Sequence, residues 1–580
     1  MGTISDKLMR IINTKEDIRQ ALISKGYDVP TSIPFKEYAK MISDLPCRVD
    51  SFPDIEGIVA RYSALGLTNE QMAANPVWVD KTGNGHDIQL KNFSWKGMSG
   101  VGGYEMNFNL WRNNVSSIPD ISMSTTTTSV SVSVGNSTYN NNLIYIHISN
   151  WDINKNHWLK VTSTYEDGDL AFIFYNDSNT KKIGLPANGY VNILAYPEFK
   201  GSYMYISTIS NKQGSFTIEQ LPLYPGALVF DGVDDYGVCD NFPILTKEKG
   251  YTVVALRQWD QDFLNTTLTG GLLSTRNYST GEGVAFEKIE SSSKGYWNLG
   301  AGGIIDFAKS PFTWQTSKQY NNVGILKGGK NHGKPLCVGC GLSGGQQCGR
   351  FAIWELVILD HDATEEELTK IKNYFVKTYP WLFPDQAWTV VGKTNEDEDR
   401  ATIANITGNG NDLVLSNFGF IEGSGYNKEG EYAGYLVTDG VDDKITSSIF
   451  EMGNDWTVIG DWKLINTGKK DNTGIVKFDS IVIYNYNPIL INIKNGRNNL
   501  IPDQNTVNAI CSDGRIYSKD WKESIYNEET ESTSKNFLTI GYSGNSYTKI
   551  AFKNLAIYPT VLSKEDFIKE YNYLQTLKAK

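Results

Sequence analysis

Two groups of three aspartates have the residue type and spacing of a candidate metal site. They stand in two similar segments, GALVFDGVDD and GYLVTDGVDD, as Asp231, Asp234 and Asp235 and as Asp439, Asp442 and Asp443. Carboxylate oxygens are the ligands that calcium prefers. An Asp-Gly pair between two apolar runs is also the strongest short-range signal for a hairpin turn. We favour the turn, and we predict no bound metal and no cofactor.

One histidine and three cysteines have a spacing close to that of a zinc knuckle. In the pattern H-x4-C-x2-C-x7-C they are His332, Cys337, Cys340 and Cys348, and imidazole and thiolate are common zinc ligands. The segment Leu336–Cys340 aligns with the later segment Leu538–Tyr542, in which Thr539 and Tyr542 replace two of the cysteines. A segment that folds without thiols at these positions needs no zinc there. We therefore interpret the cysteines as small side chains packed on a strand.

Residues for hydrolytic chemistry are sparse. Glycoside hydrolysis needs two carboxyl groups roughly 5–9 Å apart. Glu287 and Glu290 come nearest to that arrangement, and we favour their interpretation as solvated strand residues. The five histidines stand outside any HExxH or nucleophile-elbow pattern. The chain is therefore predicted not to be an enzyme and to have no catalytic residues, with a glycan-cleaving enzyme as the alternative.

Aromatic side chains are candidates for stacking on sugar rings. Five of the fourteen tryptophans stand in loop-like or strand-edge contexts: Trp95, Trp111, Trp158, Trp297 and Trp314. Most of the fourteen must lie in cores, because large aromatic side chains are mostly buried. The sequence therefore identifies no ligand-binding residues, which stay unknown from the sequence.

The elements that must position these residues repeat along the chain. Thr82–Phe93 recurs as Thr407–Phe418 with eight identities in twelve positions, an offset of 325 residues. The DGVDD segments recur at an offset of only 208 residues, so copy one contains about 117 additional residues. A strand and a helix end each copy, with Phe351 aligned to Phe552. The sequence thus predicts two related modules, the first interrupted by an insert.

The insert and the modules both have β patterns. Apolar alternation as in SVSVSV and LAFIFY predicts at least five strands in the insert, which is typical of a small β-sandwich. Aromatic residues make up 12% of the chain, which favours sheets. The closing helix is expected to be capped by Asp362 or Thr364 in copy one and by Ser563 in copy two. The predicted domains are 1–48, 49–103 with 225–384 (copy one), 104–224 (insert) and 385–580 (copy two).

The N-terminal segment 1–48 has a helical pattern, unlike the β patterns of the modules and the insert. It predicts about three short amphipathic helices, whose apolar residues are Leu8, Ile11, Ile12, Ile18, Leu22, Phe35, Tyr38 and Ile42. Helices this short cannot bury their apolar faces alone. The segment is therefore predicted to anchor or oligomerise the chain, against copies of itself or against another protein.

Net charge and length exclude several partner classes. The chain has 580 residues and a formal net charge of −11. No global positive field attracts it to nucleic acid or to anionic lipid, so neither is an expected partner. The start MGTISDKLMR lacks the apolar core of a signal peptide, and synthesis in a cytoplasm is expected.

Both copies resemble the laminin-G-like, concanavalin-A-type lectin/glucanase family. The resemblance rests on TGNGHD and TGNGND, on Trp78 before the first of these, on LVFDGVDDY and on the closing strand and helix. It implies a mainly β fold of two jelly-roll sandwiches, one interrupted by an inserted β-sandwich, plus a short helical anchor. The family includes glycan binders, adhesion modules and spacers, so the resemblance implies a fold more strongly than a function.

The N-terminal part is similar to a second family. The segments INTKEDIRQALISKGYDVP, PFKEYAKMI and ARYSALGLTNEQMAANPVW resemble virion appendage proteins of crAss-like and related phages of gut Bacteroidales. This resemblance implies a head or tail fibre located on the virion. Its partners would be other virion proteins bound through 1–48, copies of itself with a trimer favoured, and surface glycans of host or mucus. The alternatives are a fibre-borne glycan depolymerase and a purely architectural spacer without ligand.

Overall fold

The computed structural model divides the chain into two compact units, Met1–Asp54 and Ile55–Lys580. The residues that it describes are 52–104, 106–113, 121–135, 142–147, 157–166, 168–175, 180–193, 203–208, 213–245, 250–264, 266–275, 285–288, 294–297, 304–306, 315–318, 335–342, 346–407, 410–450, 453, 455–465, 473–478, 481–485, 489–493, 497–501, 507–512, 515–518, 523–525, 538–543, 546–563, 566–568, 570–571 and 574. The eight predicted anchor residues, Leu8 to Ile42, lie outside this set. The role of segment 1–48 therefore stays a prediction.

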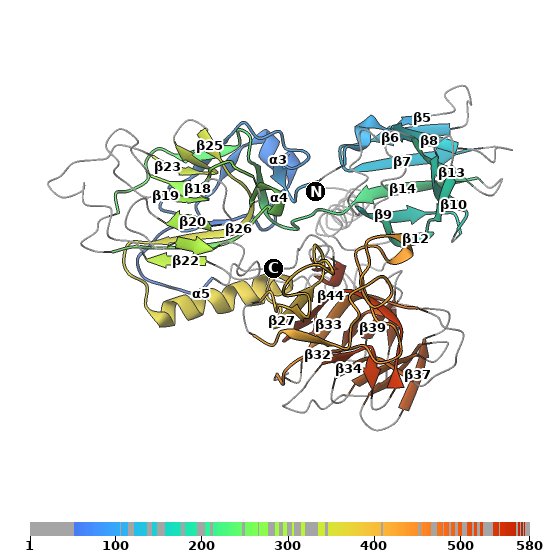
Figure 1. Ribbon diagram of the computed structural model, residues 1–580. Helices are drawn as coiled ribbons and strands as arrows, with labels where there is room; N and C mark the ends of the chain where they lie inside the picture. The colour runs from blue at the N-terminus through green and yellow to red at the C-terminus, as the bar shows by residue number, and fades with distance from the viewer. Residues whose placement is uncertain are drawn as a thin grey trace, which may run out of the picture. The chain divides into compact units, whose positions relative to one another are not determined.

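Copy one is a sandwich of two sheets, antiparallel except for one short parallel pair in the second (Figure 1). The first sheet has the order β22 (Gln315–Lys318), β17 (Thr252–Trp259), β26 (Arg350–Leu359), β15 (Leu228–Asp231) and β4 (Gly100–Val101), with β1 (Ile58–Ser63) also paired to β26. The second has the order β2 (Val77–Trp78), β3 (Ile88–Lys91), β16 (Tyr236–Cys239), β23 (Leu336–Val338), β18 (Gly270–Ser274), β19 (Ala285–Lys288), β20 (Lys294–Trp297) and β21 (Ile304–Asp306). A side branch of this sheet contains β24 (Cys340–Leu342) and β25 (Gln346–Cys348).

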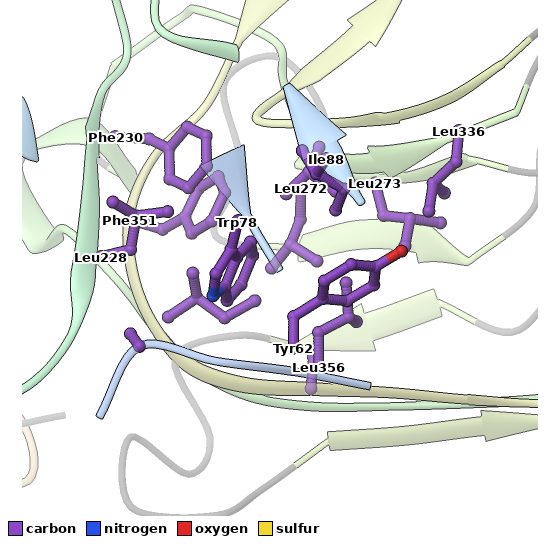
Figure 2. Packing of buried hydrophobic residues seen from close by; sticks show 14 of the residues in the cluster. Tyr62, Trp78, Ile88, Leu228, Phe230, Leu272, Leu273, Leu336, Phe351 and Leu356 are labelled. Carbon is purple, nitrogen blue, oxygen red and sulfur yellow. The ribbon is translucent and has the colours of Figure 1, made fainter. Parts of the chain in front are cut away.

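Apolar side chains from both sheets of copy one meet in one core (Figure 2). Ile88 and Leu90 of β3 point inward, while Gln89 and Lys91 between them are exposed, as the two-residue period of a strand requires. Trp78 is 1% exposed, and its indole N–H donates to the carbonyl of Ser63. The tryptophan that precedes the TGNGHD segment is therefore a core residue and not a ligand platform.

The insert contributes two five-stranded sheets of its own. The first has the order β11 (Thr180–Gly184), β10 (Leu170–Tyr175), β13 (Tyr203–Thr208), β8 (Asn142–His147) and β5 (Arg112–Asn113). The second has the order β12 (Asn188–Ile193), β9 (His157–Ser163), β14 (Gly214–Gln220), β7 (Ser129–Val134) and β6 (Ile121–Thr125). Val130, Val132 and Val134 of the alternating β7 are buried in a core made of insert residues.

Copy two repeats the two sheets of copy one. Its first sheet has the order β30 (Gly425–Tyr426), β31 (Leu436–Val437), β44 (Ile550–Tyr558), β33 (Thr457–Leu464), β38 (Val507–Cys511), β39 (Arg515–Ser518) and β40 (Glu523–Ile525), with β27 (Gln386–Thr389) paired to β44. Its second has the order β28 (Thr402–Ile403), β29 (Leu413–Ser416), β32 (Lys444–Thr446), β41 (Thr539–Ile540), β34 (Thr473–Phe478), β35 (Ile481–Asn485), β36 (Ile489–Ile493) and β37 (Arg497–Ile501). The chain is therefore mainly β, with sandwiches built in the predicted repeated order.

The closing strands align differently from the sequence prediction. Leu228 pairs with Ile353, whereas its counterpart Leu436 pairs with Phe552. Ile353, and not Phe351, therefore corresponds to Phe552. The prediction was wrong by two residues because both strands are long apolar runs, in which a shift by two residues keeps the same faces inward.

A helix follows the closing strand of copy one. Helix α5 (Glu365–Thr378) has Thr364 as its N-cap, with the capping box completed by Glu367. In copy two the Ser563 hydroxyl accepts the N–H of Asp566 at 3.1 Å. Of the two predicted caps in copy one the structure uses Thr364, and in copy two it uses Ser563. None of the helices in the described part of the chain is both long and apolar enough to cross a membrane.

Candidate functional site

The DGVDD segments form the same turn in both copies. The Asp231 Oδ1 atom accepts the N–H of Val233 at 2.7 Å, and the Asp235 Oδ2 atom accepts the N–H of Asp231 at 3.0 Å. The corresponding contacts in copy two measure 2.7 Å for Val441 to Asp439 and 2.8 Å for Asp439 to Asp443. Asp side chains that accept backbone N–H groups two residues ahead stabilise turns. These contacts confirm a turn, but the prediction of a hairpin was wrong: the turn connects β15 to β16, and in copy two β31 to β32 (Lys444–Thr446), and the two strands of each pair lie in different sheets of the sandwich.

A second loop is attached to this turn. In copy one it spans 92–100, where the Ser99 hydroxyl donates to Asp235 Oδ1 at 2.9 Å and the Asn92 amide donates to the carbonyl of Asp234 at 3.1 Å. In copy two it spans 417–425, and the Asn417 amide donates to the carbonyl of Asp442 at 3.0 Å. We name the two loops of each copy its paired loops: 92–100 with 231–235, and 417–425 with 439–443.

An aromatic residue in each loop adopts a backbone conformation that is rare outside glycine. Trp95 has φ +53° and its counterpart Phe420 has φ +51°. Trp95 stacks on Phe93 at a centroid distance of 4.8 Å and is half-buried. A left-handed conformation of a bulky residue costs free energy and persists only where the surroundings impose it. Both copies maintain this cost at the same position.

The paired loops also present polar and apolar groups to solvent. Val233 is 75% exposed and Val441 is 71% exposed, at the tips of the two turns. Asp234, Asp442 and the two asparagines that tie the loops together are exposed as well. An aromatic ring, an apolar side chain, a carboxylate and an amide form a set that offers both stacking and hydrogen bonds to a sugar. Either pair of loops is therefore a candidate binding site.

The inner carboxyl groups of the turns are electrostatically unusual. Burial, with the nearby Asp231 carboxylate, raises the pKa of Asp235 to about 7. Burial raises the pKa of Asp443 to about 6. Glycosidases use two carboxyl groups with separated pKa values at one scissile bond, whereas Asp235 and Asp443 belong to different sandwiches. Asp235 and Asp443 are also fully buried and brace a turn. We therefore assign them a structural role.

The two aspartate groups are the only places among the described residues where three potential metal ligands come together. In each, one oxygen per carboxylate lies within 4.8 Å of the others. Several of these oxygens already accept backbone N–H groups of the turn. A cation would have to compete with these donors, so the geometry favours the turn over a calcium site.

The cysteines of the predicted zinc pattern lie in strands. Cys337, Cys340 and Cys348 are buried and contact one another, and His332 lies outside the described residues. Val238 pairs with Cys337 and its counterpart Thr446 pairs with Thr539, which confirms the alignment of the cysteine segment with Leu538–Tyr542. The cysteines are absent from the groups of described residues that could hold a metal ion.

The other candidates named from the sequence are the tryptophans considered for sugar stacking and the two glutamates considered for hydrolysis. Trp111 is 1% exposed and stacks on Phe108, so it belongs to the core of the insert. Trp158 lies on β9, Trp297 on β20 and Glu287 on β19, and their side chains are outside the described part of the structure. Trp314 and Glu290 lie outside the described residues.

Sequence reasoning did not identify the loop partners of the turns. Asn92, Ser99 and Trp95 each have a counterpart 325 residues later, in Asn417, Ser424 and Phe420. Asn92 already lies inside the recurring segment Thr82–Phe93, and extending the repeat beyond Phe93 would have revealed Trp95 and Ser99 as well. The contacts of Asn92 and Ser99 with the aspartate turn, 142 and 136 residues away, required the fold.

Comparisons with known proteins do not assign a function to this chain. No protein-family model and no curated protein matches the chain. A Trypanosoma rangeli sialidase in complex with sialic acid aligns over 78% of this chain and 82% of its own, at 9% identity and a TM-score of 0.24. A botulinum neurotoxin serotype D binding domain aligns over 59% of this chain and 89% of its own, at 12% identity and a TM-score of 0.24. Similarities this weak carry no argument about fold or activity.

Proposed function

We propose that this protein is a structural component of a bacteriophage virion, a head or tail fibre that presents its sandwiches to surface glycans. The observation that carries the glycan-binding part is the recurrence of the paired loops. Both copies retain the two backbone contacts of the turn and the asparagine bond that ties the second loop to it, and both present an aromatic ring, a valine, a carboxylate and an amide, although their remaining sequences have diverged. The virion part rests on the resemblance of the N-terminal segments to phage appendage proteins.

Two sites on one chain suit adhesion to a repetitive polysaccharide. A shallow site made of one half-buried aromatic ring and a few polar groups binds a sugar weakly. A second site on the same chain raises the effective concentration for the second contact. Oligomerisation through segment 1–48, with a trimer favoured, multiplies the sites further. Weak individual contacts therefore add to firm attachment without catalysis.

Binding of the full chain to an immobilised host capsular polysaccharide, or to mucin, tests the glycan-binding part. We expect Asp234→Ala and Asp442→Ala each to weaken binding, because each removes an exposed carboxylate from one set of paired loops. The double variant should lose far more than either single variant, since avidity requires both sites.

The matched control is Asp240→Ala combined with Asp455→Ala, which removes two exposed carboxylates outside the paired loops. Equal loss of binding in this control, or unchanged binding in the Asp234 and Asp442 double variant, argues against the paired loops as the site. Absence of any glycan binding by the full chain favours the spacer alternative.

The anchoring role has a separate test. Light scattering of the full chain beside a chain starting at Arg48 measures the two solution masses. A trimeric full chain and a monomeric truncated chain are the expected results. If both are monomers, the segment 1–48 does not oligomerise the protein.

A further inference from the structure

Two of the buried cysteines form a directly opposed pair. Cys340 on β24 and Cys348 on β25 are partners in an antiparallel ladder. Directly opposed residues in such a ladder have Cα atoms about 4.5 or 5.5 Å apart. Disulfides form over Cα separations of roughly 4.4–6.8 Å. The backbone register by itself therefore places these two cysteines within bonding range.

The side chains of the pair share one environment. Cys340 is 0% exposed and Cys348 is 6% exposed, and both belong to a small cluster that includes Tyr236 and Val238. All five cysteines of the described residues are present as thiols in this structure. The pair is therefore a reduced dithiol whose side chains lie against each other.

The repeat indicates that the position is a paired contact. In copy two Tyr542 is directly opposite Tyr547 in the corresponding hairpin of β42 (Tyr542–Ser543) and β43 (Ser546–Tyr547). Cys340 aligns with Tyr542. Cys348 lies two residues before Arg350, and Tyr547 lies two residues before Lys549, the counterpart of Arg350. Cys348 therefore aligns with Tyr547. Both members of the pair have changed together, from two tyrosines to two cysteines or the reverse, which is expected of residues that contact each other.

We propose that Cys340 and Cys348 are a modification site, which closes into a reversible cross-strand disulfide when the folded protein meets a small-molecule disulfide such as oxidised glutathione. One cysteine thiolate attacks the glutathione disulfide, forms a mixed disulfide and releases one glutathione. The second cysteine attacks the mixed disulfide at the protein sulfur and releases the second glutathione, so each thiol proton leaves with a glutathione. The bond would hold the β24–β25 hairpin together in copy one. This inference does not depend on the proposed function.

The reaction is expected to be slow at neutral pH. Burial, followed by the nearby Cys340, raises the pKa of Cys348 to about 12. The attacking species is the thiolate, so the rate should increase with pH. The reduced form would thus persist during synthesis in a reducing cytoplasm and convert only on longer exposure to oxidant.

The cluster contains a third cysteine, so an experiment can tell the proposed disulfide from the other pairings that are possible. Cys337 lies on β23 beside the pair, and its ladder partners are Val238 and Ser274 rather than a cysteine. Ladder register therefore singles out the bond between Cys340 and Cys348 from the three pairings that three thiols allow.

Oxidation of the full chain with oxidised glutathione, followed by alkylation and peptide mass spectrometry, tests the proposal. We expect a peptide linking Cys340 to Cys348, a melting temperature raised by several degrees, and reversal of both by dithiothreitol. The Cys337→Ser variant should form the same link, and Cys348→Ser should not. If Cys348→Ser fails to fold, Cys340→Ser serves in its place.

A positive control comes from copy two. The double variant Tyr542→Cys/Tyr547→Cys places a dithiol at the same opposed position and should close under the same oxidant. A dominant bond that involves Cys337 overturns the proposal. So does a native chain whose Cys340 and Cys348 both remain alkylatable, whether or not the engineered pair has closed.

Discussion

The two sandwiches share their sheet order but differ in what lies beneath the closing helix. In copy one Arg61 and Glu355 form an ion pair, with Nε and Oε2 3.3 Å apart and both side chains at most 5% exposed. Tyr379 donates to Glu355 at 2.7 Å, and Arg61 donates to the hydroxyl of Tyr374 at 2.8 Å. These residues connect β1, β26 and α5. Copy one therefore holds its helix on the sheet partly through buried charge.

Copy two has neither charge. Arg61 pairs with Val357, and Ala387 pairs with Ala556. Val357 and Ala556 are counterparts, because each lies four positions after the aligned residues Ile353 and Phe552. Ala387 therefore takes the place of the arginine. Asn554 replaces Glu355, two positions after the same reference residues. Ala387 and Ala556 belong instead to an apolar cluster with Phe567, Tyr571 and Leu574. The comparison shows that both members of the ion pair are absent together from copy two, which agrees with the cost of leaving either of these two buried charges without the other.

The largest expected effect comes from breaking this pair on one side. Arg61→Ala leaves the Glu355 carboxylate buried without its cation and should destabilise the chain by about 3–5 kcal/mol. The double variant Arg61→Ala/Glu355→Asn reproduces copy two and should recover much of that loss. Urea unfolding, followed by tryptophan fluorescence, measures both. A double variant as unstable as the single variant would contradict the view that the two residues act as a unit.

An intermediate effect is expected from the pH dependence of the paired loops. The pKa values of Asp235 and Asp443, about 7 and about 6, exceed the ordinary value of 3.8. The folded state therefore favours the protonated form of each group. The stabilisation from each group is fully present below pH about 4, and it is lost as the pH rises through the pKa of that group in the folded protein. The loss should end about one pH unit higher in copy one than in copy two, and it amounts to roughly 4 kcal/mol for Asp235 and roughly 3 kcal/mol for Asp443.

Asp235→Asn and Asp443→Asn separate the two contributions. Each substitution should flatten the pH dependence of the unfolding free energy over the range assigned to its own copy, measured by urea unfolding between pH 4 and 8. Identical pH profiles for the two variants would contradict the difference between the copies.

The smallest effect concerns the helix caps. Thr364 has a complete capping box, in which Glu367 accepts the N–H of Thr364 at 2.7 Å. The Ser563 hydroxyl accepts the N–H of Asp566 at 3.1 Å and donates to its carboxylate at 2.8 Å. Thr364→Ala should cost about 1 kcal/mol and Ser563→Ala about 0.5 kcal/mol. Hydrogen exchange of the two helices measures each cost, and Thr369→Ala on the exposed side of α5 provides the reference.

Much of the secondary structure and of the repeat could be predicted because their signals are local. Val130, Val132 and Val134 alternate with serines and form a strand with one buried face. The DGVDD turn needs only neighbouring residues, and Thr364 caps its helix three residues from Glu367. In each case the interacting groups lie within a few positions of one another, so the local sequence pattern is enough to predict the interaction seen in the structure.

Other features depended on residues far apart in the chain. Ser99 braces Asp235 from 136 positions away, and Arg61 meets Glu355 across nearly the whole of copy one. The opposed cysteines Cys340 and Cys348 are close in sequence, but their pairing depends on the register of β24 against β25. Register is set by ladder hydrogen bonds and by the packing of a whole sheet face. The amino-acid order by itself therefore determined the strands, turns and repeats of this protein, while only the tertiary structure decided which distant side chains share a site, because burial and pairing are properties of the assembled sheets.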